Sequence, residues 1–246
     1  MTADRAVTAS GGIVDGAGRS PRQMFDDIAP KYDAANRVMS AGVDIVWRKK
    51  AIKRLLAGLG ETPRLLDLGA GTMDGALEIV HRAPGATVAA ADFARQMLRA
   101  GLGKLNTDDL RARVRPAVAD GHTLPYADAA FDGAFSAFCV RNLGDLPRAM
   151  RELRRVVRPG GRVAILEFFR PEKPRFFFDK IYNAHVLPLL GWAVSGDREA
   201  YRYLPASIAA FRSREEFAAL LREVGFAEVD ARGLFPSSVA SLVVAS

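Results

Sequence analysis

Short apolar runs alternate with longer helix-like segments through the middle of this 246-residue chain. Strands are predicted at residues 64–68, 87–91, 114–119, 131–138 and 162–167. Helices are predicted over the residues that lead to Val80, over 95–105 and over 146–157. Parallel strands need crossover connections of this kind, and such crossovers place helices on both faces of one sheet. The alternation therefore predicts a doubly wound α/β fold.

The C-terminal part of the chain completes the predicted sheet. A helix is expected at 214–224, and strand-like runs follow at 227–234 and 241–244. The short link at 235–238 allows a hairpin, which is permissible at the end of an otherwise parallel sheet. We expect a mostly parallel, seven-stranded sheet with a C-terminal antiparallel hairpin.

Three segments lie outside the alternation. Residues 1–20, rich in small residues, are predicted to be a mobile tail, so the folded domain is expected at 21–246. Residues 21–60 look helical, with a break at Pro30 and a predicted helix N-cap at Asp44. Residues 168–208 carry many aromatic side chains among prolines and are interpreted as an insertion that caps a substrate site.

Cysteine and histidine usage excludes two kinds of site. Cys139 is the single cysteine, which excludes an internal disulfide and a cysteine-based metal site. No two of the three histidines stand at metal-ligand spacing. We therefore expect no metal.

The net charge of +7 favours anionic partners. The sequence has no run of five consecutive basic residues that would support nucleic-acid binding, so no nucleic-acid partner is expected. One predicted helix face carries Arg148, Arg151, Arg155 and Arg158, which we interpret as solvated, with anionic lipid as the alternative. No signal peptide or bilayer-spanning stretch stands out, so we expect a cytoplasmic protein. Peripheral contact with the inner face of the membrane and a homodimer both stay open.

A glycine turn follows the first predicted strand directly. Gly69 and Gly71 let a ligand approach the backbone at the carboxyl end of the strand, where open α/β sheets bind ligands. Asp67 and Asp74 flank the turn, and Asp74 stands where a dinucleotide fingerprint requires its third glycine. Carboxylates there disfavour a pyrophosphate and suit a ligand with an ammonium and a sulfonium. The turn therefore predicts S-adenosylmethionine as cofactor.

Two further carboxylates end the next strands. Asp92 can accept both ribose hydroxyls, and Asp120 can accept from the adenine amino group, with Gly121 giving close backbone access. The alternative is a plain tight turn whose aspartates only cap helices. Three strand-end carboxylates in this order favour a pocket for a cationic nucleoside.

Several longer motifs then point to one family. They include Phe25-Asp26-Asp27-Ile28-Ala29, Trp47-Arg48, Phe138-Cys139-Val140-Arg141-Asn142, Leu166-Glu167-Phe168 and Tyr201-Arg202-Tyr203-Leu204-Pro205. Through them the chain resembles the ubiquinone/menaquinone biosynthesis C-methyltransferases from about Phe25 onwards. The resemblance implies a class I methyltransferase of Rossmann-like fold that methylates a ring carbon of a prenylated quinol. Demethylmenaquinol is the first candidate substrate, and the ubiquinone-pathway benzoquinol is the second.

Positions that match the family imply cofactor roles for Thr72, Asp92, Asp120 and Gly121. Together with the turn they make the expected cofactor-binding set, which is Tyr32, Asp67, Gly69, Gly71, Thr72, Asp92, Phe93, Asp120 and Gly121.

Carbon methylation needs an electron-rich ring carbon, which a quinol provides when one hydroxyl is deprotonated. Arg141 is predicted to orient and stabilise that oxygen, with Asn142 in support; the alternative for Arg141 is a structural ion pair. Because arginine cannot act as a base, the proton is expected to leave through water, His185 or Tyr201. For His185, a packing role is the alternative.

One departure from the family pattern affects the cofactor turn. Met73 stands where the family usually has glycine, and it is strained if that position requires a positive φ. Two other functions therefore stay open: methyl transfer to another small phenolic or lipid-like acceptor, and a non-catalytic cofactor-binding module that assembles other enzymes. A dinucleotide oxidoreductase is the least favoured.

Overall fold

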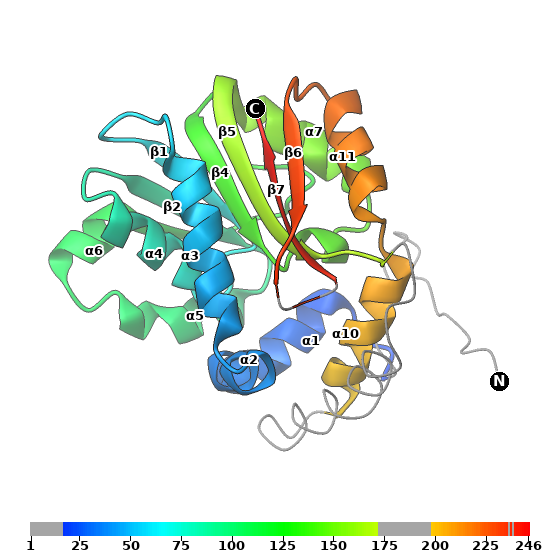
Figure 1. Ribbon diagram of the computed structural model, residues 1–246. Coiled ribbons are helices and arrows are strands. Elements are labelled where there is room, and N and C mark those ends of the chain that lie inside the picture. Colours follow the sequence, from blue (N-terminus) through cyan, green and yellow to red (C-terminus); the bar gives the residue numbers. More distant parts are fainter. Residues whose placement is uncertain (1–16, 172–197, 236, 238) are drawn as a thin grey trace.

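The computed structural model describes residues 17–171, 198–235, 237 and 239–246. Within them one sheet runs in the order β3-β2-β1-β4-β5-β7-β6 (Figure 1). Its strands are β1 (Arg64–Leu68), β2 (Thr87–Asp92), β3 (Val114–Val118), β4 (Phe131–Ala137), β5 (Val157–Phe168), β6 (Val229–Gly233) and β7 (Ala240–Ala245). Strands β1 to β5 pair in parallel, while β7 is antiparallel to both β5 and β6. The predicted seven-stranded sheet with a C-terminal antiparallel pair is confirmed.

Helices lie on both faces of the sheet and across one end of it. They are α1 (Pro21–Ile28), α2 (Tyr32–Ser40), α3 (Val43–Leu56), α4 (Asp74–Arg82), α5 (Arg95–Gly101), α6 (Asp108–Arg113), α7 (Leu146–Val156), α10 (Arg198–Ala210) and α11 (Arg214–Glu223). Short 3-10 turns occur at η1 (Ala29–Lys31), η2 (Leu102–Lys104) and η3 (Val140–Asn142). None of the described helices is both long and apolar enough to cross a membrane.

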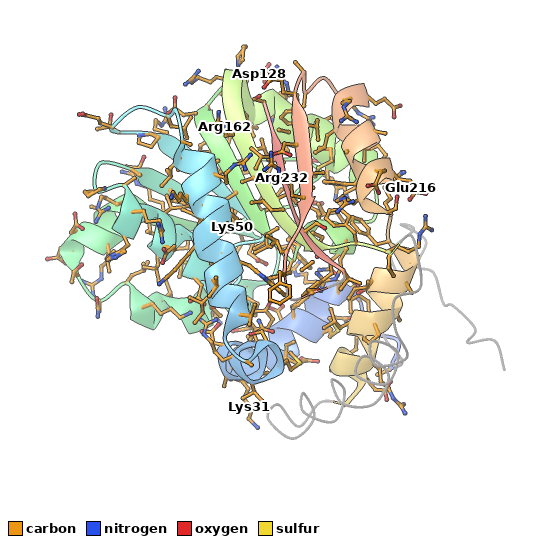
Figure 2. All side chains as sticks on the ribbon, viewed as in Figure 1. Lys31, Lys50, Asp128, Arg162, Glu216 and Arg232 are labelled. Carbon is orange, nitrogen blue, oxygen red and sulfur yellow. The ribbon has the colours of Figure 1, made fainter. Side chains whose placement is uncertain are left out.

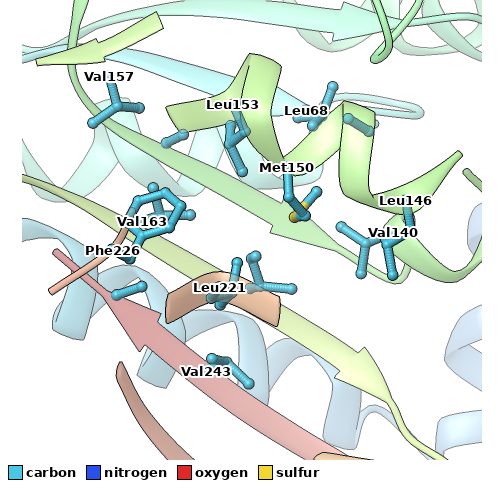
Figure 3. Packing of buried hydrophobic residues seen from close by; sticks show 14 of the residues in the cluster. Leu68, Val140, Leu146, Met150, Leu153, Val157, Val163, Leu221, Phe226 and Val243 are labelled. Atoms are coloured by element: carbon cyan, nitrogen blue, oxygen red, sulfur yellow. The ribbon is translucent and has the colours of Figure 1, made fainter. Parts of the chain in front are cut away.

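Two cores sandwich the sheet because neighbouring residues of a strand point to opposite faces. In β1, Leu65 packs on one face with α3 and α4, while Leu66 packs on the other with α7 and α11. Figure 3 shows Met150 and Leu153 of α7 and Leu221 of α11 in the second core. Burial on both faces explains why these strands are continuously apolar instead of alternating.

Several element boundaries differ from the sequence expectation. The strand predicted at 162–167 begins earlier, at Val157, because Val157 pairs with Phe131 beyond an irregularity in the ladder. The helix predicted at 95–105 ends at Gly101 and continues only as a 3-10 turn. The prediction of Asp44 as an N-cap is wrong: α3 is preceded by Gly42 at a φ of +77°, and Asp44 lies inside the first turn. There its buried carboxylate pairs with Arg37 and Arg48.

The N-terminal helices lie beyond the carboxyl ends of the parallel strands (Figure 1). Helix α1 begins with a capping box between Ser20 and Gln23, and it packs against α5. Met24 and Ile28 of α1 share a small buried cluster with Tyr203 of α10. Of the predicted insertion at 168–208, residues 172–197 lie outside the described part of the chain, as do residues 1–16 of the predicted tail.

Candidate active site

A cavity of about 380 Å³ opens at the carboxyl end of β1. The glycine turn forms one side of it, and α2 and α3 form another. Aromatic and aliphatic side chains from the ends of β4 and β5 and from α10 form the rest. Its walls include Tyr32, Asn36, Val43, Trp47, Arg48, Asp67, Gly69, Gly71, Thr72, Phe138, Arg141, Phe168 and Leu204. One space therefore joins the predicted cofactor turn to the predicted catalytic arginine.

The glycine turn has a shape that only glycine allows at its first position. Gly69 has a φ of +73°, and a Cβ there would lie 2.2 Å from Cys139 Sγ. Gly71 also has a positive φ, and its amide donates to Asp92 Oδ2 at 2.8 Å. The other Asp92 oxygen accepts from the Ala94 amide at 2.7 Å. Through these two hydrogen bonds Asp92 holds the turn in place from the end of β2. Burial raises the pKa of its carboxyl group.

Met73 adopts the positive φ that the sequence left undecided. Its φ is +68°, immediately before α4, and its side chain is fully buried. That side chain packs on Gly101, where a Cβ would lie 2.8 Å from Met73 Cε. A left-handed conformation costs a non-glycine residue on the order of 1 kcal/mol or more. Met73 is therefore strained, but it is not among the residues that line the cavity.

Asp67 is a buried carboxylate at the cavity wall. Its Oδ2 finds no hydrogen-bond partner among the described residues. Burial raises the pKa of Asp67 to about 7. A Cβ on Gly75 would lie 2.7 Å from the same oxygen, so only glycine leaves room for this carboxylate. A buried acceptor without a donor suits an ammonium group brought by a ligand.

Asp74, on the other flank of the turn, is held by cations of the protein itself. Its oxygens contact Lys104 at 2.6 Å, Arg37 at 2.7 Å and Arg48 at 3.4 Å. Burial acts to raise the pKa of Asp74, but these cations hold it below its usual value. Thr72 joins the group by donating to Asp33 Oδ1 at 2.6 Å. The charge of Asp74 thus balances arginine and lysine and is not left for a ligand.

Arg141 is fixed by four hydrogen bonds. Nη1 donates to Glu167 Oε1 at 2.7 Å and to the Phe138 carbonyl at 2.8 Å. Nε donates to Ser207 Oγ at 3.3 Å, and the backbone amide donates to Glu167 Oε2 at 3.2 Å. Burial acts to lower the pKa of Arg141, but the neighbouring Glu167 carboxylate more than offsets it, so the pKa of the guanidinium is raised. Arg141 therefore combines the two predicted alternatives: it is in a buried ion pair, and it lines the cavity.

None of the other predicted catalytic residues is among the described residues that line the cavity. Asn142 accepts a hydrogen bond from the Tyr203 hydroxyl at 3.0 Å and does not line the cavity. Tyr32 does line it, and burial raises the pKa of its hydroxyl. His185 lies outside the described residues, and so does the side chain of Tyr201, whose backbone belongs to α10.

Four residues of the predicted cofactor-binding set lie outside the cavity. They are Asp92, Phe93, Asp120 and Gly121. The Phe25 ring of α1 packs edge-on against Phe93, with ring centroids 6.4 Å apart. Asp120 accepts from the backbone of His122 at 2.9 Å and from its Nδ1 at 2.6 Å. Burial acts to raise the pKa of Asp120, yet these bonds to His122 lower it.

Sequence reasoning did not assign a role to two residues of this site. Glu167 appeared only as part of a family motif, although an acidic residue at the end of an apolar strand signals a buried partner. Arg48 likewise appeared only as part of the Trp47-Arg48 motif. In the structure its side chain is only 13% exposed and borders the cavity beside Asp44 and Asp74.

The sheet order, the glycine turn at the end of β1 and the orphan carboxylate together define a class I S-adenosylmethionine-dependent methyltransferase. Within that class, the ubiE/COQ5 methyltransferase family matches residues 17–243, and the chain belongs to this family. The expected resemblance is thereby confirmed, with its cofactor, and a dinucleotide oxidoreductase is excluded.

Relatives of known name match over most of their length. Demethylmenaquinone methyltransferase of Thermus thermophilus is 44% identical over 204 residues, which cover 82% of this chain and 91% of that protein. Ubiquinone/menaquinone biosynthesis C-methyltransferase UbiE of Geotalea uraniireducens is 38% identical over 211 residues, covering 85% and 88%. The expectation of a quinone-biosynthesis C-methyltransferase is confirmed at the level of the family.

Solved structures support the fold. Phosphoethanolamine N-methyltransferase 2 of Haemonchus contortus superposes with a TM-score of 0.67 at 19% identity, covering 89% of this chain and 47% of that one. A methyltransferase of Aquifex aeolicus that depends on S-adenosylmethionine gives 0.56 at 21% identity, covering 80% and 88%. At these identities the similarity concerns the fold alone.

Proposed function

We propose that this enzyme transfers the methyl group of S-adenosylmethionine to a ring carbon of a prenylated quinol, with demethylmenaquinol as the first candidate. The observation that carries this proposal is the single cavity that joins the glycine turn to Arg141 through an aromatic wall. The names of the relatives, demethylmenaquinone methyltransferase and UbiE, support the substrate class.

The residues present fit the cofactor. The orphan Asp67 oxygen would accept from its ammonium group, and the bare backbone at Gly69 and Gly71 would allow its close approach. Arg48 borders the same cavity and would face its carboxylate. Asp92, Phe93, Asp120 and Gly121, which do not line the cavity, would take the adenosine part. When bound, S-adenosylmethionine supplies the electrophilic methyl group.

The protein's own part is to align the ring, exclude water and hold negative charge on the quinol oxygen. Trp47, Phe138 and Phe168 would hold the ring, and the guanidinium of Arg141 would stabilise the phenolate. Tyr32, kept neutral by its raised pKa, would donate a hydrogen bond to the same ligand. The base stays a choice between water, His185 and Tyr201.

The direct test incubates the purified protein with methyl-labelled S-adenosylmethionine and a short-tailed demethylmenaquinone, with and without dithionite. We expect label on the ring carbon, detected by mass spectrometry, only under reducing conditions. Arg141→Ala should abolish it while cofactor binding persists. Product from the benzoquinol precursor alone would move the assignment to the ubiquinone pathway.

Two other outcomes would replace the proposal. Methylation only of a different phenolic or lipid-like acceptor would assign the alternative substrate class. Cofactor binding without turnover on any acceptor would favour the non-catalytic module, although Met73, the residue that raised that alternative, does not reach the cavity.

A cytoplasmic location with peripheral contact at the inner face of the membrane belongs to the same proposal, because the substrate carries an isoprenoid tail. A homodimer is a further part of it, which sedimentation analysis would test.

A further inference from the structure

Large apolar side chains stand exposed next in sequence to the walls of the cavity. Phe235 is 93% exposed, Val46 63% and Val38 46%. Each is close in sequence to residues that line the cavity: Val38 precedes Met39, Val46 precedes Trp47, and Phe235 lies two residues before Ser237. The Trp47 indole donates to the Phe235 carbonyl at 3.0 Å, which ties the β6–β7 connection to α3. We refer to these three exposed residues as the apolar rim.

A basic strip continues from this rim along α3. The outward face of the helix carries Val46, Lys49, Lys50 and Lys53, which are all exposed at helical spacing. No ion pair engages these lysines within the described part of the chain. Figure 2 shows Lys50 on α3 and Arg232 on β6 on the side of the sheet that α3 covers.

The neighbouring strand adds to the positive charge. Arg54 of α3 contacts Asp230 at 2.6 Å, and Arg232 contacts the same carboxylate at 2.8 Å. Two arginines thus share one acid, so the strip made of Lys49, Lys50, Lys53, Arg54 and Arg232 keeps a clear positive excess.

The arginine face of α7 is the alternative lipid contact that the sequence suggested. Unlike the lysines of α3, most of its arginines are bonded to other groups of the protein. Arg155 pairs with Glu152 and Asp128, and Arg158 pairs with Asp132. Arg148 donates to the His122 carbonyl and to Thr123. Three of the four arginines are thus already bonded to the protein, and among the described residues α7 itself carries no exposed large apolar side chain.

We propose that the apolar rim and the basic strip together dock on an anionic lipid bilayer, with the mouth of the cavity turned toward the membrane. Phe235 enters the interface, Val38 and Val46 follow it, and the lysines meet lipid phosphates. A lipid surface fits better than a folded protein partner, because lysine is depleted in protein interfaces while it is favoured beside anionic headgroups. This inference rests on the proposed function only for the purpose that it gives to membrane docking, which is delivery of a prenylated substrate to the cavity.

Sedimentation with vesicles tests the proposal on the full-length protein without substrate. Vesicles of phosphatidylglycerol and phosphatidylcholine should bind the protein, and vesicles of phosphatidylcholine alone should bind it far less. Replacing Lys49, Lys50 and Lys53 with Gln should weaken binding on the order of tenfold to a hundredfold at low salt. Phe235→Ser should weaken it as well, and more at high salt, where the electrostatic part is screened.

A charge-matched control uses Arg99, Arg111 and Arg115, which are exposed near the β3 edge of the sheet. Replacing all three with Gln should leave vesicle binding unchanged. Equal losses in the two triple variants, or no loss in either the lysine triple variant or Phe235→Ser, would overturn the proposal. So would binding to polyanionic RNA with the same lysine dependence but no binding to vesicles, which would assign the strip to nucleic acid.

Methyl transfer to a tailless, water-soluble quinol separates this inference from the proposed function. The lysine and Phe235 variants should retain that activity, since none of these side chains lines the cavity. Vesicle binding without any methyl transfer would refute the proposed function and leave the docking face standing.

Discussion

At the scale of single residues, Glu167 fixes the position of the Arg141 guanidinium at the cavity wall. It is fully buried at the end of β5, and both of its oxygens accept from Arg141. A buried charge pair of this kind is costly to break, because the remaining charge is left unpaired. Glu167 is thus a positioning residue for Arg141, which no motif alone identified.

We expect Glu167→Gln to lower kcat roughly a hundredfold, since a small displacement of an aligned group has that effect. The affinity for S-adenosylhomocysteine should stay within about twofold of the parent, because Glu167 does not line the cavity. Steady-state kinetics and calorimetry measure the two quantities. Glu216→Gln, which breaks an exposed pair with Arg170, is the matched control and should change neither. An unchanged kcat in Glu167→Gln would refute the positioning role.

Asp67 makes the free protein sensitive to pH. Its folded-state pKa of about 7 lies above the usual 3.8, so the folded chain holds this proton where the unfolded chain has lost it. The stability contribution is therefore full below about pH 4 and is lost as the pH rises to about 7. Cofactor affinity should move the opposite way and rise through pH 7, because the ionised carboxylate binds the ammonium.

Thermal unfolding and calorimetric titration between pH 5 and pH 8 would measure both trends for Asp67. In Asp67→Asn we expect a flatter stability profile and weak, pH-independent cofactor binding. Asp132→Asn, a partly exposed carboxylate with a lowered pKa, serves as a control and should leave the rise in affinity intact. An affinity that falls with pH in the parent protein would contradict the assignment of Asp67.

At the scale of elements, the start of α4 combines strain with packing. Met73 holds a left-handed conformation directly before this helix, and its buried side chain fills space against Gly101. Removing a buried methionine side chain costs about 2–5 kcal/mol, while relief of the backbone strain returns on the order of 1 kcal/mol. The packing effect is the larger.

Met73→Gly should therefore lower the free energy of unfolding by about 1–4 kcal/mol, despite restoring the residue usual for the family. Urea denaturation measures this change, and cofactor affinity should stay the same because Met73 does not reach the cavity. Met73→Ala, which keeps the strain and loses the packing, should be the less stable of the two variants. A gain in stability on Met73→Gly would show that strain outweighs packing.

The elements that the sequence predicted best are those with a clear apolar pattern, both strands and helices. Strands β1, β2 and β4 agree with their apolar runs to within a residue or two. The prediction was poorer where tertiary contacts set the limits: β5 extends to Val157 through pairing with Phe131, and Asp44 serves an ion-pair network instead of a cap. The short helix α6, capped by Thr107, was not predicted at all.

At the scale of the whole molecule, the candidate site draws on distant parts of the chain. The glycine turn was predictable because one local motif contains it. Arg48 and Trp47 come from α3 and Glu167 comes from β5, and only the folded arrangement shows that they belong to one cavity or support it. Local sequence patterns therefore predict the cofactor-binding part of the site better than the part that receives the substrate.

The sheet order has a consequence for biosynthesis. Strand β7 follows every other described strand in sequence, yet it lies inside the sheet between β5 and β6. A ribosome therefore releases β7 last, and until then the edge of β5 and all of β6 lack their partner. Exposed strand edges promote aggregation, so a nascent chain stalled before Ala240 is a natural client for chaperones. The same late strand completes the connection that carries Phe235, so the chain cannot present its docking face before β7 has been made.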